Sequence, residues 1–368
     1  MIAKIRSFVK KETVLCISAL CAVATMFFYP PDAGYVEYID LRVLCLLFCL
    51  MAVVAGFKSA GVFNSLTYQL LNKIKNGKVL SVALILLPFF SSMLVTNDVA
   101  LIIFIPFTIA LLAESGCKKA IIPVTVLQTV AANLGSMATP VGNPQNLYLY
   151  STFNLSAKDF FSATLPLTLV SLVGLTLACL PVLPKKLAVS KVKHEKIRDK
   201  KYLLCFVILF LFSILSVFRV VPYQLLTPVT VAVIIILDRK LFKEIDFMLL
   251  LTFVCFFIIS GNLGKLDTVQ SFLQQLLEKS TLLTSCGASQ IISNVPAAVL
   301  LSGFTDNWKE LLMGVNIGGL GTPVASLASL ITLKFYTKSP EAKTVKFLAV
   351  FSAVNIIGLV ILLAFTLI

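Results

Sequence analysis

The sequence predicts an all-α polytopic membrane protein. Of its 368 residues, 58% are hydrophobic and 13% are charged, whereas a soluble domain has roughly 25% charged residues. The apolar runs are long enough for membrane-spanning helices rather than for barrel strands. Two of these runs are interrupted by clustered glycine, proline and asparagine. Such interruptions end a helix, and at membrane depth they persist only where protein or a cavity covers the broken backbone.

The formal net charge is +14. The basic residues fall in a few loops between apolar runs, so their excess predicts orientation by the positive-inside rule rather than binding to nucleic acid. The sequence has no phosphate-binding Gly-rich loop, no intramembrane pair of acids and no cluster of metal ligands. Its 9 cysteines are scattered, mostly in apolar runs. We therefore expect a protein that is not an enzyme and has no cofactor.

The first half is expected to contain six segments in order. Residues 1–40 predict a first span and an acidic outer loop, because basic residues precede the apolar run and acidic ones follow it. The next part, 41–183, predicts a span, a hairpin, a broken helix and a returning span. We expect these four at 41–57, 79–113, 120–150 and 160–183. Two full spans joined by a tight outer turn are the alternative to a re-entrant hairpin over 79–113.

The second half is expected to repeat this order. Residues 184–201 carry a run of Lys and Arg and predict a cytoplasmic linker between the halves. Two scaffold spans should follow within 202–246. The last part, 247–368, predicts a span, a hairpin, a broken helix and a final span. The hairpin is expected at 268–304 and the broken helix at 311–333.

With both hairpins re-entrant, the chain crosses the membrane about nine times by span length. Every strongly basic loop then lies on one side, which places the N-terminus in the cytoplasm and the C-terminus outside. A plasma membrane is therefore predicted, with a bacterial inner membrane as the expected one.

The two interrupted runs are similar to each other. Residues 133–146 and 316–326 share Asn, Gly, Thr, Pro and Val in one register. Each run follows a polar hairpin tip, Thr96-Asn97 in the first half and Ser293-Asn294 in the second. The span before the first hairpin runs inward and its counterpart runs outward, so the repeat is inverted. Two broken segments at matching places in inverted halves indicate the binding site of a secondary transporter.

The chemistry of these segments suits ions. Half-helix N-termini and Asn amides favour an anion, and Thr96, Thr139, Ser293 and Thr322 add hydroxyl groups. Unwound carbonyls and side-chain oxygens suit a small cation such as Na⁺. Each half could therefore build one cation site, with an anionic solute held between them.

Asp98 is the one carboxylate in these motifs. Acids within a membrane are costly and usually functional, so Asp98 is a candidate for binding a cation or carrying a proton. The alternative is a structural role as the N-cap of a half-helix that begins at Val99. The two roles are compatible.

At these residues the chain resembles the ion transporter superfamily over 41–368. This superfamily includes divalent anion:sodium symporters, citrate-transporter-like permeases, arsenite efflux pumps and sodium/proton antiporters, and the permeases are the most similar branch. The tips Asn97 and Asn294 stand where the symporters carry Ser-Asn-Thr. Asp98 and Val295 depart from that pattern, because they replace the Thr and so remove two hydroxyl groups. An Asn-Asp tip is more similar to the arsenite branch.

The resemblance implies a homodimer in the lipid bilayer, with a static scaffold and a transport domain that moves as an elevator. It implies that solute contacts come from Thr96, Asn97, Asp98, Asn143, Ser293, Asn294, Val295 and Thr322. It implies that Na⁺ contacts come from Asn97, Asn133, Gly135, Thr139, Gly142, Asn143, Asn294, Asn316, Gly318 and Thr322.

The leading hypothesis is a secondary active transporter that moves a small anionic solute, an inorganic anion or a carboxylate, coupled to Na⁺ or H⁺. The alternative is arsenite or antimonite efflux, or Na⁺/H⁺ exchange, with Asp98 as the coupling acid. A channel of the same fold is a third hypothesis.

Overall fold

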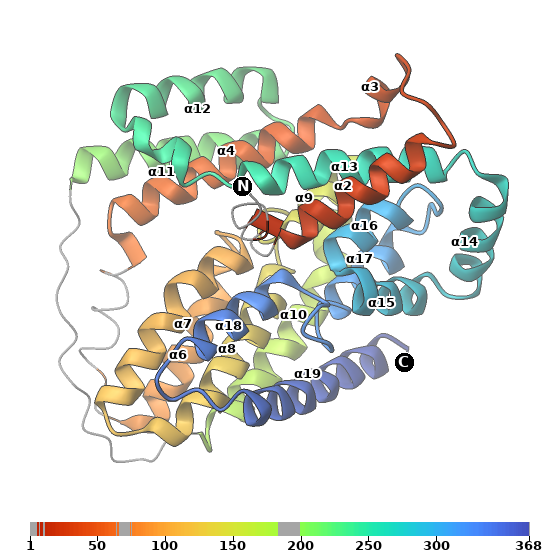
Figure 1. The fold of residues 1–368 in the computed structure, drawn as a ribbon. Helices are drawn as coiled ribbons and strands as arrows, with labels where there is room; N and C mark the ends of the chain where they lie inside the picture. Colours follow the sequence, from red (N-terminus) through yellow and green to blue (C-terminus); the bar gives the residue numbers. More distant parts are fainter. Residues whose placement is uncertain are drawn as a thin grey trace.

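The computed structural model describes residues 6, 8–9, 12–63, 65, 74, 76–182 and 199–367. All regular elements in these ranges are helices (Figure 1), so the predicted all-α class is confirmed for this part of the chain. Five of the described helices are long and apolar enough to cross a membrane. These are α4 (Leu41–Ser59), α7 (Asn97–Glu114), α10 (Ala157–Cys179), α11 (Lys200–Val217) and α19 (Thr344–Leu367). The chain is therefore a multi-pass membrane protein, and the crossing number stays a prediction.

One group of helices is built around α4. Helices α11 and α12 (Tyr223–Leu237) pack on α4, and α2 (Thr13–Met26) packs on α13 (Phe247–Leu263), which also contacts α4 and the short α3 (Tyr35–Tyr38). They occupy the upper part of Figure 1. Aspartates fix where these helices begin: Asp40 and Asp246 each accept a backbone N–H of the first turn, from Val43 at 3.0 Å and from Leu249 at 2.9 Å. We call α2, α4, α11, α12 and α13 the scaffold group.

Most of the other helices form a second group, which carries the predicted motifs. The exceptions are α3, which packs on α13, and the short η2 (Arg239–Lys243), which packs on α4 and α12. Helix α8 lies at its centre and packs against α6, α7, α10, α18 and α19. The bounds of the remaining helices are α6 (Gly77–Ser91), η1 (Lys118–Ala120), α8 (Ile121–Ser136), α9 (Pro144–Thr152), η2 (Arg239–Lys243), α14 (Asp267–Lys279), α15 (Thr281–Ile292), α16 (Asn294–Leu301), α17 (Trp308–Ile317) and α18 (Leu327–Thr337).

The first hairpin and both broken helices fall in the predicted ranges. Helices α6 and α7 lie within or close to 79–113, α8 and α9 divide 120–150, and α17 and α18 divide the region of 311–333. In each broken pair the interruption coincides with the Gly- and Pro-containing motif, because these residues end a helix. Most of the predicted linker over 184–201 lies outside the described residues, and α11 begins at its end, where Asp199 accepts a hydrogen bond from the Lys201 N–H.

The predicted bounds of the second hairpin, 268–304, are wrong at the start. Residues 267–279 form the separate helix α14, which is bent by 101° from α13. The chain then turns at Ser280, whose hydroxyl accepts the Leu283 N–H at 3.2 Å and starts α15. The hairpin therefore consists of α15 and α16. Helix α14 is amphipathic, and the apolar residues on one of its faces were mistaken in the sequence for the start of a hairpin arm.

Gly135 permits the close approach of α8 to α6. A Cβ atom at Gly135 would lie 2.1 Å from the carbonyl oxygen of Phe89, which is backbone and cannot move aside. Gly318 has a similar place in α17's C-terminal turn, where a Cβ would lie 2.8 Å from the Cβ of Ser289 in α15. Two of the three glycines of the predicted cation sites, Gly135 and Gly318, are thus required by helix packing.

We predict that Gly135→Ala lowers the free energy of unfolding by about 1–3 kcal/mol, because α8 must move away from α6. The measurement is the thermal unfolding midpoint of the purified protein in detergent. Gly174→Ala is the matched control, since Gly174 also lies within a helix and a Cβ there meets no atom within 4 Å. Equal midpoints for the two variants would contradict this packing.

Candidate functional site

Each hairpin tip is joined to the broken helix of its own half by the same backbone hydrogen bond. The Asn97 N–H donates to the Gly142 carbonyl at 3.1 Å, and the Asn294 N–H donates to the Ala325 carbonyl at 2.9 Å. Gly142 and Ala325 occupy the same position in the two motifs, two residues after the shared proline. The two tip asparagines therefore have equivalent backbone contacts.

The shared threonines make a second matched pair of bonds. The Thr139 hydroxyl donates to the Met93 carbonyl at 2.5 Å, and the Thr322 hydroxyl donates to the Gln290 carbonyl at 3.1 Å. Met93 and Gln290 each lie four residues before the tip asparagine of their hairpin. Both threonines, predicted as cation or solute ligands, thus hold a hairpin to a broken helix.

Buried asparagines connect the two halves. Asn316 donates to the Asn146 Oδ1 at 2.7 Å and to the Leu312 carbonyl at 2.8 Å, and its own Oδ1 accepts from Asn143 at 3.2 Å. The side chains of Asn143, Asn146 and Asn316 are at most 3% exposed. A buried amide without a partner costs about 1–3 kcal/mol, so these bonds hold the two broken helices together.

The first tip joins the same cluster. The Asn97 Nδ2 donates to the Asn133 Oδ1 at 3.0 Å, which also accepts the Ser326 hydroxyl at 3.1 Å. Asn133 in turn donates to the Gly319 carbonyl at 3.3 Å. The predicted residues Asn97, Asn133, Asn143 and Asn316 are thus brought together. We call them, with Asn146, the asparagine cluster.

The second tip lies beside the first across a very small cavity. Ser293, with φ of +73°, directs its hydroxyl toward the Ala325 carbonyl at 3.4 Å, and Val295 is 6% exposed in the apolar core. Asn97, Asp98, Asn294 and Val295 line a space of about 10 Å³, which is about the size of one water molecule. The predicted solute position between the tips is closed in this structure.

A much larger crevice lies between the scaffold group and the second group. Its volume is about 1180 Å³, and it is bounded by α2, α4 and α13 on one side and by α7, α9 and α18 on the other. Thr96, Asp98 and Asn143 line it beside the tips. Charged side chains line it elsewhere, and they include Lys58, Lys243, Glu244, Asp246 and Lys334. Thr322 does not belong to this lining.

Asp98 lies in the first turn of α7 and is not its N-cap. Helix α7 begins at Asn97, with Thr96 as the N-cap residue, so the alternative of an N-cap before Val99 is wrong. The Asp98 N–H donates to the Asn97 Oδ1 at 3.0 Å. Its carboxylate oxygen Oδ1 is buried and has no hydrogen-bond partner among the described residues. An acidic side chain here faces the positive end of the α7 dipole.

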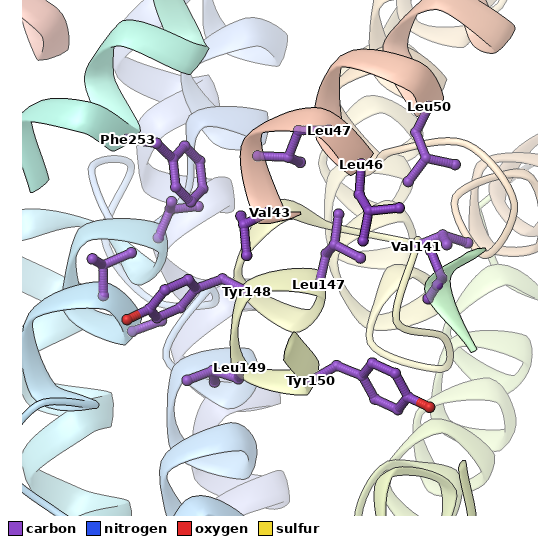
Figure 2. Close-up of a cluster of buried hydrophobic side chains, with 14 of the residues drawn as sticks. Val43, Leu46, Leu47, Leu50, Val141, Leu147, Tyr148, Leu149, Tyr150 and Phe253 are labelled. Atoms are coloured by element: carbon purple, nitrogen blue, oxygen red, sulfur yellow. The ribbon is translucent and has the colours of Figure 1, made fainter. Parts of the chain in front are cut away.

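The interface between α4 and α9 is apolar. Figure 2 shows Val43, Leu46 and Leu47 of α4 beside Leu147 of α9, with Tyr150 farther along α9.

Arg219, in the turn between α11 and α12, binds the C-terminal end of α9. It donates to the Tyr150 carbonyl at 3.0 Å and to the Leu155 carbonyl at 2.9 Å. Its guanidinium carbon lies 5.2 Å from the centre of the Tyr150 ring.

The sequence prediction missed four residues that complete the site: Ser136, Asn146, Gln290 and Ser326. Ser136 and Asn146 lie inside the first motif, and Ser326 ends the second. Gln290 is an amide within the apolar run of α15, which is the signal that could have identified it.

Comparison with known proteins places the chain in a family. A sequence model of the citrate transporter family matches residues 2–307. An uncharacterized transporter of Methanocaldococcus jannaschii is 31% identical over 328 residues, which are 89% of each chain. The inner membrane protein YbiR of Escherichia coli is 29% identical over 86% of this chain and 85% of its own. The chain belongs to the citrate transporter family.

One relative with a named substrate matches a smaller part of the chain. The silicon efflux transporter of Oryza sativa is 34% identical over 141 residues, which are 38% of this chain and 28% of that protein.

We predict that Asn316→Ala lowers the free energy of unfolding by about 1–3 kcal/mol, because Asn143 and Asn146 both lose a buried partner. Thermal unfolding in detergent measures this. The control is Asn355→Ala, which removes a buried asparagine of α19 whose amide donates within its own helix, to the Phe351 carbonyl at 2.9 Å. If Asn355→Ala lowered the midpoint as much as Asn316→Ala, the cross-half bonds would have no special role.

Proposed function

We propose that the protein is a secondary active transporter that moves a small anionic solute, an inorganic anion or a carboxylate, coupled to Na⁺ or H⁺. One observation carries the proposal: two hairpin tips and two broken helices meet at the asparagine cluster, beside a crevice of about 1180 Å³ that contains Thr96, Asp98 and Asn143. Broken helices that line a cavity are how transporters build a solute site within the membrane.

An inverted repeat is part of the proposal. The matched bonds of Asn97 and Asn294 support it, as do those of Thr139 and Thr322. Helix packing adds a further argument, because α7 contacts α18 and α16 contacts α9. Each hairpin's second arm thus contacts the second half of the other repeat's broken helix, as a two-fold relation would require. We propose that both hairpins are re-entrant.

Alternating access is proposed to occur by movement of the second group past the scaffold group. The apolar surface between α4 and α9 has few polar bonds to break, which suits sliding. Lys58, Lys243 and Lys334 lie along the crevice, so the positive-inside rule makes its opening cytoplasmic. The bonds of Arg219 would then lie at the outer end and break when the crevice closes. A homodimer built on the scaffold group completes this picture.

A transport assay tests the proposal. Protein in liposomes is given phosphate, sulfate, citrate, succinate or arsenite, with and without an inward gradient of Na⁺ or H⁺. We expect concentrative uptake of one anion that stops when the driving gradient is removed. Equilibration without accumulation under every gradient would contradict secondary active transport and support a channel.

Asp98 supports the second candidate, which is efflux of arsenite or antimonite, or Na⁺/H⁺ exchange, with Asp98 as the coupling acid. Its buried oxygen has no partner among the described residues and it lines the crevice. The partial match to a silicon efflux transporter also favours an export function.

We predict that Asp98→Asn separates the two candidates. If Asp98 carries the coupling proton, flux driven by a pH gradient should fall to that of protein-free liposomes, because an amide cannot take up a proton. If the solute is driven without Asp98, uptake should persist. Asp246→Asn is the control, because it removes a carboxylate from the same crevice while Asn still caps α13. Equal losses in both variants would indicate a general effect of crevice charge.

A further inference from the structure

The carbonyl groups of the second broken helix surround a side-chain nitrogen. The Nε2 of Gln290 donates to the Gly318 carbonyl at 2.8 Å and to the Leu320 carbonyl at 2.9 Å, and it lies 3.3 Å from the Cys286 carbonyl. The Oε1 of the same amide accepts the Thr322 N–H at 2.9 Å. Two carbonyl oxygens at the end of the broken helix and one of α15 thus converge on one atom, as oxygens do around a cation that an unwound helix holds.

The pocket around Gln290 is fitted to its amide. Gly321 has a φ of +107°, and a Cβ atom there would lie 2.2 Å from the Gln290 Oε1. A side chain at position 321 would therefore displace the amide. The glycine serves both the turn and the space that Gln290 fills.

In the first broken helix the carbonyl groups at the end of α8 also surround a side-chain nitrogen, which comes from α9. The Nδ2 of Asn146, from α9, lies 3.4, 3.3 and 3.2 Å from the carbonyl oxygens of Ser136, Met137 and Thr139. Its Oδ1 accepts from Asn316 at 2.7 Å. Met93, which matches Gln290 in position, has no amide to offer. In both halves a side-chain amide thus binds the carbonyls of the broken helix, although the two amides come from positions that do not correspond.

We propose that Asn146 and Gln290 are built-in substitutes for coupling cations, so the loops of the two broken helices bind no Na⁺. A carboxamide NH₂ group satisfies the carbonyls of a broken helix permanently, and it occupies the volume that the ion would need. Coupling is meaningful only for a transporter, so this inference rests on the proposed function. It leaves Asp98 as the group that couples transport to an ion.

The first test compares thermal unfolding of the purified protein in NaCl and in choline chloride at equal concentration. If the protein binds Na⁺, a free Na⁺ concentration of about 100 times the Kd would raise the thermal unfolding midpoint by several degrees. We expect equal midpoints in the two salts. A saturable, Na⁺-specific rise that persists in Asp98→Asn would overturn the proposal. A rise that disappears in Asp98→Asn would place the ion on that carboxylate and support it.

The second test changes the amide into a carboxylate. In Gln290→Glu an oxygen replaces the nitrogen among the three carbonyls, so we expect a lower midpoint in choline chloride and a recovery of several degrees specific to Na⁺. Gln275→Glu, on the exposed face of α14, is the matched control and should show no preference between the salts.

A folded Gln290→Glu protein with equal midpoints in both salts would contradict the proposal. If that variant does not fold, Gln290→Ala vacates the pocket, and the same gain of Na⁺-specific stability is expected. Neither measurement requires a transported solute. Failure of the liposome screen would therefore reject the proposed function without affecting this inference, and the reverse also holds.

Discussion

Lipid offers no hydrogen bond to a broken backbone, and this constraint explains the centre of the molecule. Helices α8 and α17 both end in the middle of apolar segments, which leaves carbonyl groups without helical partners. Side-chain amides supply those partners, with Asn146 in the first half and Gln290 in the second. The cost of an unpaired buried polar group is high enough that these amides fix the geometry around them.

The same amides determine where the helices meet. Because Asn316 binds both Asn143 and Asn146, the second broken helix lies against the first. Because Asn97 binds Asn133, the first hairpin tip lies against both. Glycines then allow close approach at positions 135 and 318. The position of the large crevice follows, since its wall of α7, α9 and α18 is the exposed side of this assembly.

Much of this could be predicted from the sequence, because clustered Gly, Pro and Asn in an apolar run allow few interpretations. The first hairpin tip, both broken helices and four of the five asparagines of the cluster were identified in this way, and Asn146 was missed. The start of the second hairpin was not, because the apolar residues of α14 resemble those of a hairpin arm. The partner of each asparagine could not be predicted either. Asn143 binds across to Asn316, in the other half, and Gln290 fills a loop that was expected to hold a cation. Such pairings depend on distances of a few tenths of an ångström, which no pattern of residue types contains.

The proposed mechanism requires the crevice to open alternately to the two sides of the membrane, and site-directed labelling would detect this. Ile102 lines the crevice on α7 and is 40% exposed. A membrane-impermeant thiol reagent would be applied to Ile102→Cys from each side of oriented vesicles, with the unsubstituted protein as the baseline for native cysteines. We expect labelling from the side bearing Lys58 and Lys334 at rest, and from the opposite side when an opposing solute gradient reverses the conformation. Labelling from one side alone under every gradient, or from both sides at once, would contradict alternating access.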